Sequence, residues 1–203
     1  MTHRTGIVVI GRNEGERLIA SLESVRGQGC PVVYVDSGSS DGSAARARSL
    51  GDTVVELDPA RPFSAARARN EGFGALKARD PALGAVQFID GDCTLLPGWI
   101  ASASRAMTAD ARRAVVIGPL QERRPDASVY NRLCAMEWKS PAGDLTNFGA
   151  MGGIMLVRAE VFARLGDSPK LPHQALRASF SQRELEYDGA GIELSAQTTP
   201  ATP

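Results

Sequence analysis

The chain has 203 residues, of which 43% are hydrophobic and 23% charged, as expected for one sizeable globular domain with its own core. Lysine plus arginine and aspartate plus glutamate each number 23, so the net charge is zero, and only 5% of residues are aromatic. This balance argues against nucleic acid as a partner, because nucleic-acid-binding surfaces are basic and single-strand platforms are rich in aromatic residues.

The sequence indicates neither a disulfide framework nor a membrane span. Its three cysteines, Cys30, Cys93 and Cys134, are odd in number and widely spaced, which is typical of reduced thiols. No apolar run is long enough to cross a bilayer, and the N-terminal residues lack the apolar core of a signal peptide. We therefore expect a cytoplasmic protein, and peripheral association with the inner face of a membrane is compatible with this composition.

Short apolar runs alternate with segments of helical periodicity along the first 117 residues. The runs that predict strands are 7–10, 32–35, 53–57, 85–89 and 114–117. Helices are predicted after Asn13, after Asp41, after Ser64 and over 99–107, with Asn13 and Glu16 as a capping box and Asp41 and Ser64 as N-caps. Continuous apolar strands between amphipathic helices indicate an α/β fold, in which a mostly parallel sheet lies between two helical layers.

The pattern changes after residue 117. A helix is predicted over 127–138, a glycine-rich loop over 146–153, a strand over 154–157 and a short helix over 159–165. From residue 167 onward no period is sustained. We therefore expect one domain over residues 1–166 and a divergent, poorly ordered tail over residues 167–203.

Two carboxylates, Asp90 and Asp92, directly follow the apolar run 85–89. Residues i and i+2 of an extended chain point the same way, so both side chains can converge on one ion, and Gly91 permits a tight turn between them. Oxygen ligands favour a hard cation such as Mg²⁺ or Mn²⁺. A strand that ends in a simple Asp-Gly turn is the alternative interpretation.

Further polar residues follow other strand ends, namely Asn13 and Asp36. Ligands of parallel sheets bind at the carboxyl ends of the strands, so these residues and Asp90 are expected at one edge of the sheet. Their convergence favours a site for a metal and a nucleotide. The alternative for Asp36 is an Asx turn within its own loop.

Four short segments in this order resemble the motifs of one enzyme family. They are 8–14 (VVIGRNE), 35–42 (VDSGSSDG), 68–70 (ARN) and 90–92 (DGD). They are similar to motifs of the family 2 glycosyltransferases, which are nucleotide-sugar-dependent enzymes with the Rossmann-like GT-A fold. The likeness covers about residues 5–165 and implies a three-layer αβα architecture with a mostly parallel central sheet.

The resemblance also implies roles for individual residues. Asp92 would bind Mn²⁺ or Mg²⁺ directly, and Asp90 would lie near the ribose or the metal. The nucleotide-binding residues would be Asn13, Asp36, Ser37, Arg69 and Asp90. The partners would be a nucleotide-diphosphate sugar, with uridine diphosphate as the default base, and a glycan or lipid-linked acceptor. Arg69 has a second interpretation as a solvated helix residue.

The expected general base is not found. Transfer with inversion needs a base that deprotonates the acceptor hydroxyl, and the family takes it from an acidic residue beyond the strand matched here by 152–157. At that distance this chain lacks the acidic pair, and the substitutes are Glu184, Glu186 and Asp188, which a polar surface segment also explains. The sequence therefore predicts a metal-dependent glycosyltransferase. A nucleotide-sugar-binding module without catalysis and a nucleotidyltransferase are the alternatives.

Overall fold

A six-stranded sheet forms the centre of the computed structural model, which describes residues 4–118, 120–137, 154–166 and 192–194. The strand order is β3-β2-β1-β4-β8-β6. These strands are β1 (Thr5–Gly11), β2 (Val32–Asp36), β3 (Thr53–Glu56), β4 (Ala85–Asp90), β6 (Val115–Val116) and β8 (Ile154–Arg158). Strands β1 to β4 run parallel, and β8 is antiparallel to β4 and β6. The predicted mostly parallel α/β sheet is confirmed.

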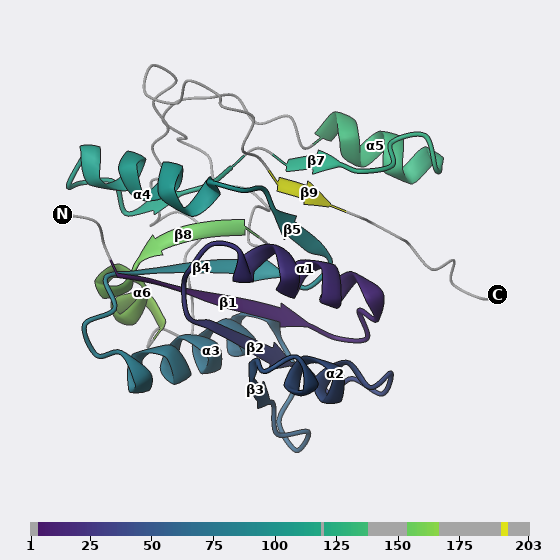
Figure 1. Cartoon of the computed structure of the whole chain (residues 1–203), viewed down its shortest axis with the longest axis horizontal. Helices are drawn as coiled ribbons and strands as arrows, with labels where there is room; N and C mark the ends of the chain where they lie inside the picture. Colours follow the sequence, from purple (N-terminus) through teal and green to yellow (C-terminus); the bar gives the residue numbers. More distant parts are fainter. Residues whose placement is uncertain (1–3, 119, 138–153, 167–191, 195–203) are drawn as a thin grey trace.

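Helices cover both faces of this sheet (Figure 1). One apolar cluster joins the sheet to α1 (Glu16–Arg26), α2 (Ser43–Ser49) and α4 (Trp99–Ala109). A second cluster, on the other face, joins it to α3 (Ala65–Arg79) and α6 (Ala159–Gly166). Alternate residues of β1 enter the two clusters, so the strand is apolar throughout because neither of its faces meets water.

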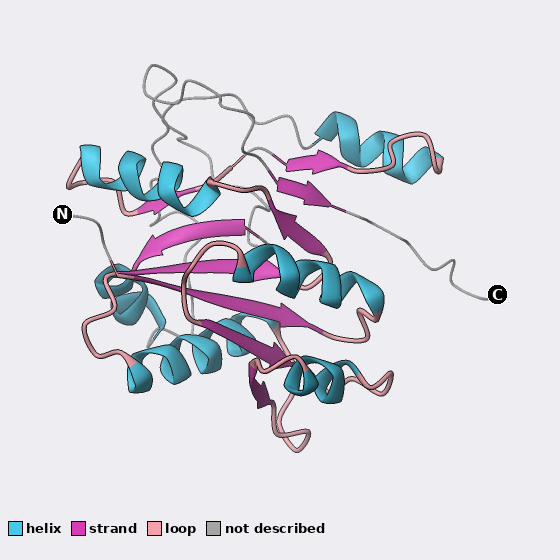
Figure 2. Ribbon diagram, in the orientation of Figure 1, coloured by secondary structure: helices cyan, strands magenta, loops and turns pink. Residues whose placement is uncertain are grey.

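A second, three-stranded sheet begins beside the Asp-Gly-Asp segment (Figure 2). Its order is β5-β9-β7, and its strands are β5 (Cys93–Leu95), β7 (Leu120–Glu122) and β9 (Ile192–Leu194). The sequence pattern predicted none of these strands, because each is only three residues long. Helix α5 (Val129–Glu137) follows β7, and its residues Val129, Tyr130, Leu133 and Met136 are exposed.

The predicted capping box at the start of α1 is wrong. The N-cap of this helix is Gly15, and no side chain caps it. Asn13 adopts a left-handed backbone conformation with φ of 58°, and Glu16 instead accepts hydrogen bonds from the Arg46 guanidinium. Contacts between distant loops have overridden the local pattern. Asp41 lies one residue before the N-cap of α2, Gly42, and accepts from the Ser43 N–H at 3.0 Å.

Helix α3 begins as predicted, because Ser64 is its N-cap and accepts from the Arg67 N–H. Ala68 and Leu76 of this helix are buried, whereas Ala65 is exposed. The helix approaches the sheet closely at Gly72, where an added Cβ would lie 2.4 Å from Val8 Cγ1. A glycine at this position therefore sets the distance between α3 and the strands.

The first residue of α4, Trp99, makes a buried polar contact with the central sheet. The indole Nε1 of Trp99 donates to Gln87 Oε1 at 2.9 Å, and both side chains are buried. Trp99 is thus a core residue.

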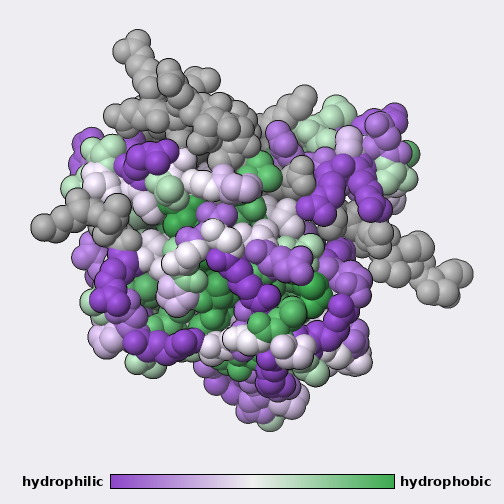
Figure 3. Space-filling view, in the orientation of Figure 1, coloured by the Kyte–Doolittle hydropathy of each residue, from purple (hydrophilic) through white to green (hydrophobic). Residues whose placement is uncertain are grey.

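Hydrophilic residues dominate the rim of the face in Figure 3, and hydrophobic residues gather towards its middle. Among the described residues, no helix has the length and apolar character that a membrane span needs.

Candidate functional site

The strand ends bring the predicted polar residues to one edge of the sheet. In the register of the sheet, Gly11 of β1 pairs with Asp36 of β2, and Ile10 pairs with Asp90 of β4. Neighbouring strands lie about 4.8 Å apart, so the backbones of Asp36 and Asp90 lie roughly 10 Å apart on either side of β1. The Gly91 N–H donates to the Ile10 carbonyl at 2.7 Å, which turns the chain towards Asp92. The predicted convergence is confirmed.

A hollow of about 330 Å³ opens at this edge and contains the site. Three carboxylates line it, those of Glu14, Asp90 and Asp92, together with Ser37 and the ring of Phe63. Sequence reasoning assigned no role to Glu14 or Phe63. Glu14 directly follows Asn13 in the family-like segment, so its position was a usable signal. Phe63 lies in a loop without periodicity, so only the fold shows that it reaches the site.

Asp90 is held by an arginine from α3. Arg69 Nη2 lies 3.2 Å from Asp90 Oδ1, and the Arg69 side chain is only 14% exposed, so its interpretation as a solvated helix residue is wrong. Burial raises the pKa of Asp90, the adjacent Asp92 carboxylate raises it further, and the Arg69 guanidinium opposes both effects. Arg69 thus orients a carboxylate that remains partly open to the hollow.

Glu14 lies across the ends of two neighbouring strands. A Cβ added to Gly11 or Gly91 would come within 3.1 or 3.2 Å of Glu14 Cγ, so both glycines make room for this side chain. Its carboxylate pairs with Arg17 Nη2 at 2.8 Å. Burial raises the pKa of Glu14, Arg17 lowers it, and the negative charges of Asp92 and Asp90 raise it.

Asp36 is buried and organises its own loop. The Tyr34 hydroxyl donates to Asp36 Oδ1 at 2.7 Å, and the N–H groups of Gly38 and Ser39 donate to Oδ2 at 3.1 and 2.8 Å. The Asx-turn interpretation is therefore confirmed, and the side chain is only 2% exposed. A direct contact between Asp36 and a nucleotide stays a prediction. The neighbouring Ser37 lines the hollow, and its N–H donates to the Gly11 carbonyl at 3.0 Å.

Asn13 joins the two loops that frame the hollow. Its N–H donates to Ser39 Oγ at 2.9 Å, and its Oδ1 accepts from the Ser40 N–H at 2.8 Å. The Gly15 N–H donates to Asp41 Oδ2 at 3.0 Å. These bonds tie the loop after β1 to the loop after β2. The structure thus gives Asn13 a scaffolding role, and its contact with a nucleotide stays a prediction.

The carboxylate oxygens that line the hollow suit a cation whose remaining ligands come from water and a substrate. The described part of the chain contains no group of three or more histidine, cysteine, aspartate or glutamate side chains that could by itself hold a metal. Asp90 and Asp92 supply carboxylate oxygens, and Mg²⁺ and Mn²⁺ commonly take one or two carboxylates and complete their shells with water and phosphate oxygens. The residues present therefore fit such a cation. Glu184, Glu186 and Asp188 lie outside the described residues.

The raised pKa values predict a pH dependence. In the metal-free protein, Asp90 and Glu14 hold their protons more tightly than in the unfolded chain, so they contribute stability at low pH that is lost as the pH rises through their folded pKa values. A cation competes with these protons. We expect the affinity for Mn²⁺ plus nucleotide to fall as the pH is lowered from neutrality, and the fall to begin above the ordinary aspartate pKa of 3.8. Calorimetric titrations across this range would check it, and a constant affinity would contradict it.

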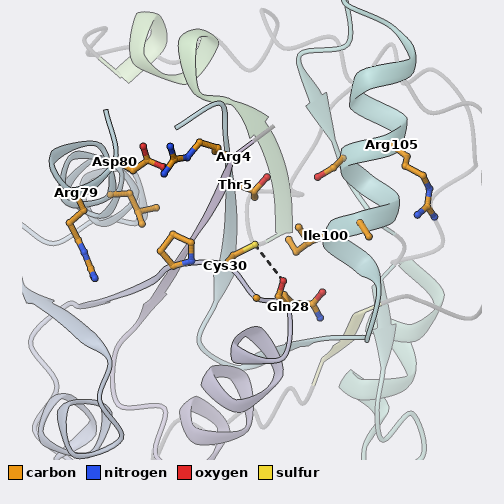
Figure 4. Close-up of a pocket in the computed structure, with 13 residues that line it drawn as sticks. Arg4, Thr5, Gln28, Cys30, Arg79, Asp80, Ile100 and Arg105 are labelled. Carbon is orange, nitrogen blue, oxygen red and sulfur yellow. Dashed lines mark hydrogen bonds and ion pairs between the residues drawn. The ribbon is translucent and has the colours of Figure 1, made fainter. Parts of the chain in front are cut away.

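A larger hollow, of about 780 Å³, lies at the opposite end of the strands, beside Thr5 at the start of β1. Figure 4 shows Arg79 and Arg105 on its two sides, with Cys30 and Ile100 between them. None of the predicted site residues lines it. The length of β1 places it roughly 20 Å from Asp90. The chemistry predicted from the sequence therefore belongs to the smaller hollow.

Comparisons with known proteins agree with this geometry. The model of the family described as "Glycosyl transferase family 2" matches residues 6–166. No match was found among curated proteins. Among solved structures, the chain is similar to a mannosyltransferase from Pyrobaculum calidifontis in complex with GDP-Man and Mn²⁺. The identity is 22% and the TM-score 0.58, and the match covers 82% of this chain and 47% of that one.

Two other solved structures show the same fold. GalNAc-T7 with UDP, GalNAc and Mn²⁺ is 13% identical with a TM-score of 0.60, over 95% of this chain and 42% of that one. Glucosyl-3-phosphoglycerate synthase from Mycobacterium tuberculosis, with Mn²⁺, UDP-glucose and glycerol 3-phosphate, is 19% identical with a TM-score of 0.55, over 80% and 59%. The chain thus spans about half the length of these proteins.

These identities show the fold alone, whereas the family model matches most of the chain and includes the segments that frame the hollow. The GT-A-like architecture expected from the motifs is therefore confirmed. The chain belongs to glycosyl transferase family 2.

Proposed function

We propose that this chain binds a nucleotide-diphosphate sugar together with Mn²⁺ or Mg²⁺ and transfers the sugar to a glycan or lipid-linked acceptor. The observation that carries the proposal is the convergence of Asp90, Asp92 and Ser37 on one hollow at the carboxyl ends of the parallel strands. Membership of the family supports the reaction class. Uridine diphosphate is the default donor base. Because solved structures of the same fold contain GDP-Man or UDP-glucose, guanine donors belong in the same test.

Each residue at the hollow has a proposed role that follows from its position. Asp92 would bind the cation, and Asp90, oriented by Arg69, would face the ribose or the water shell of the cation. When bound, the cation would neutralise the charge that develops on the departing nucleoside diphosphate. Asn13 and Asp36 would hold the two loops in place for the nucleotide. Inversion of the sugar needs a base at the acceptor hydroxyl, and Glu184, Glu186 and Asp188 are the candidates.

Calorimetry against a panel of UDP- and GDP-sugars, with Mn²⁺, with Mg²⁺ and without either cation, tests this function. We expect one class of donor to bind, and to bind only in the presence of the cation. The absence of binding by every donor with either cation would refute the proposal. A product assay with the donor that binds then separates the transferase from the second candidate, a nucleotide-sugar-binding module.

One observation favours that second candidate. The carboxylates that line the hollow are Glu14, Asp90 and Asp92, and Asp90 and Asp92 are already assigned to the donor and its cation. Glu14 is paired with Arg17. Within the described residues, no further acid lines the hollow where an acceptor hydroxyl would be deprotonated. Metal-dependent binding without transfer or hydrolysis would establish the binding module and exclude the enzyme.

A further inference from the structure

The larger hollow has the size and the apolar wall of a site for a small organic molecule. It lies between the C-terminal end of α3, helix α4 and the loop before β2 (Figure 4). Its volume of about 780 Å³ is within the range of roughly 300–1,000 Å³ that is usual for ligand cavities. Its apolar lining residues are Cys30, Pro31, Leu76, Ile100 and Ala101. Leu76 and Ile100 belong to the clusters on opposite faces of the sheet, so the hollow touches both layers of the core.

The charged residues that line this hollow are unequal in number. They include Arg4, Arg79 and Arg105, whereas Asp80 is the one carboxylate among the described lining residues. Arg4 Nε pairs with Asp80 Oδ2 at 2.9 Å, and the two side chains face each other in Figure 4. This pair balances its own charges and leaves two positive charges beside the hollow. Because the whole chain has a net charge of zero, these charges are a local excess.

Arg79 and Arg105 donate hydrogen bonds to uncharged oxygens. Arg79 Nη1 donates to the Thr53 hydroxyl, and Arg105 Nη2 donates to Ser102 Oγ at 3.0 Å. Within the described part of the chain, neither guanidinium forms an ion pair with a carboxylate. Both residues are exposed, so each can exchange its hydroxyl partner for an anion without the loss of a buried contact. A hydrogen bond to an anion is charge-assisted and therefore stronger than one to a neutral oxygen.

The combination of an apolar wall and excess cations favours one class of ligand. An uncharged apolar molecule would leave both guanidinium groups with their present neutral partners. An inorganic anion would leave the apolar wall exposed to water. A molecule that joins an apolar body to an anionic group uses both features, because it buries apolar surface and forms charge-assisted hydrogen bonds at the same time.

We propose that the larger hollow is a second binding site, for a small organic anion with an apolar body. The apolar body lies against Leu76 and Ile100, and its carboxylate, sulfonate or phosphate group pairs with Arg79 and Arg105. The fork of a guanidinium matches the paired oxygens of such groups. The inference goes beyond the proposed function and does not depend on it, because the two hollows share no lining residue.

Two matched fluorescent probes test the charge requirement. Anilinonaphthalene sulfonate is an apolar ring system with an anionic group, and phenylnaphthylamine has the same rings without the charge. Arg79→Gln and Arg105→Gln should each weaken binding of the sulfonate by about 2- to 5-fold and leave binding of the uncharged probe unchanged. An unchanged affinity for the sulfonate, or an equal loss for both probes, would overturn the proposal.

The matched control is Arg132→Gln, which removes an exposed positive charge from α5, outside the hollow. It should leave the affinities for both probes unchanged. A loss of sulfonate binding equal to that in Arg79→Gln would show that only the overall charge of the protein matters. That result would overturn the assignment to this hollow.

The thiol of Cys30 locates the bound probe without a change of sequence. It lines the hollow and is half-buried, so the sulfonate should slow its alkylation by iodoacetamide in proportion to the fraction of protein that is occupied. Cys134 of α5 is also half-buried, lies outside the hollow and should react at an unchanged rate. Mass spectrometry of the peptides measures both rates. Unprotected Cys30 at saturating sulfonate would place the probe elsewhere and overturn the proposal.

Competition against the sulfonate distinguishes two sources of such an anion. Displacement by dodecyl phosphate at a lower concentration than by phenyl phosphate would support the proposal and identify a lipid-like chain as the apolar body. The reverse order would support it with a compact ring in that place. Inorganic phosphate that displaced the probe as well as either compound would show that no apolar body is needed, and the proposed class of ligand would be wrong.

Discussion

Replacement of Asp92 by asparagine is expected to abolish the Mn²⁺-dependent part of donor binding. The carboxylate lines the hollow beside Asp90, and the amide that replaces it carries no charge for the cation. A bound metal contributes several kcal/mol of charge stabilisation, so the affinity for UDP with Mn²⁺ should fall by about 100-fold or more. Calorimetry with and without Mn²⁺ measures this difference directly. Asparagine has nearly the same size as aspartate, so the fold should survive.

The electrostatics of the site add a second signature to Asp92→Asn. The Asp92 charge raises the pKa values of Glu14 and Asp90, so its removal should lower both and relieve repulsion between neighbouring carboxylates. The metal-free variant should therefore unfold at the same temperature as the wild type or a higher one. Asp126→Asn is the matched control, because Asp126 is 90% exposed and pairs with Arg132 at the surface. Mn²⁺-dependent binding that persisted in Asp92→Asn would refute the assigned role.

Replacement of Gly72 by alanine is expected to destabilise the fold by about 1–3 kcal/mol, although alanine is the better helix former. The reason is the close approach of α3 to the sheet. The added Cβ would lie 2.4 Å from Val8 Cγ1 and 2.9 Å from Val35 Cγ2, well inside normal contact distance. The helix must then move away from the strands, and the apolar cluster between them loses contacts. Urea unfolding, with the midpoint compared at constant slope, measures the loss.

The same helix provides the control for this prediction. Gly74 lies two residues further along α3, is exposed, and has no atom within 4 Å of an added Cβ. Gly74→Ala should therefore stabilise the protein by up to about 1 kcal/mol, since only the helical propensity changes. If Gly72→Ala were as stable as Gly74→Ala, the close packing of α3 on the sheet would be wrong.

The central strands and the edge at which the site lies could be predicted from the order of residue types along the chain. Strands such as β1 and β4 consist mainly of continuous apolar residues, because helices cover both faces of the sheet. Such a run is visible in the sequence without knowledge of the fold. Parallel strands place their carboxyl ends together, so Asp36 and Asp90 had to meet at one edge of the sheet. The N-cap Ser64 was readable for the same reason, because it depends only on the next three residues.

Which atoms of that edge remain open to a ligand depends on the packing of distant segments. Asn13 lost its predicted capping role because bonds to Ser39 and Ser40, 26 and 27 residues away, outweigh one local hydrogen bond. Asp36 turned inward to Tyr34 and its own loop, and Arg69 turned towards Asp90 instead of solvent. Glu14 and Phe63 joined the hollow through packing on Gly91 and Gly38. Each outcome depends on contacts between segments distant in the chain, which no local pattern of residue types encodes.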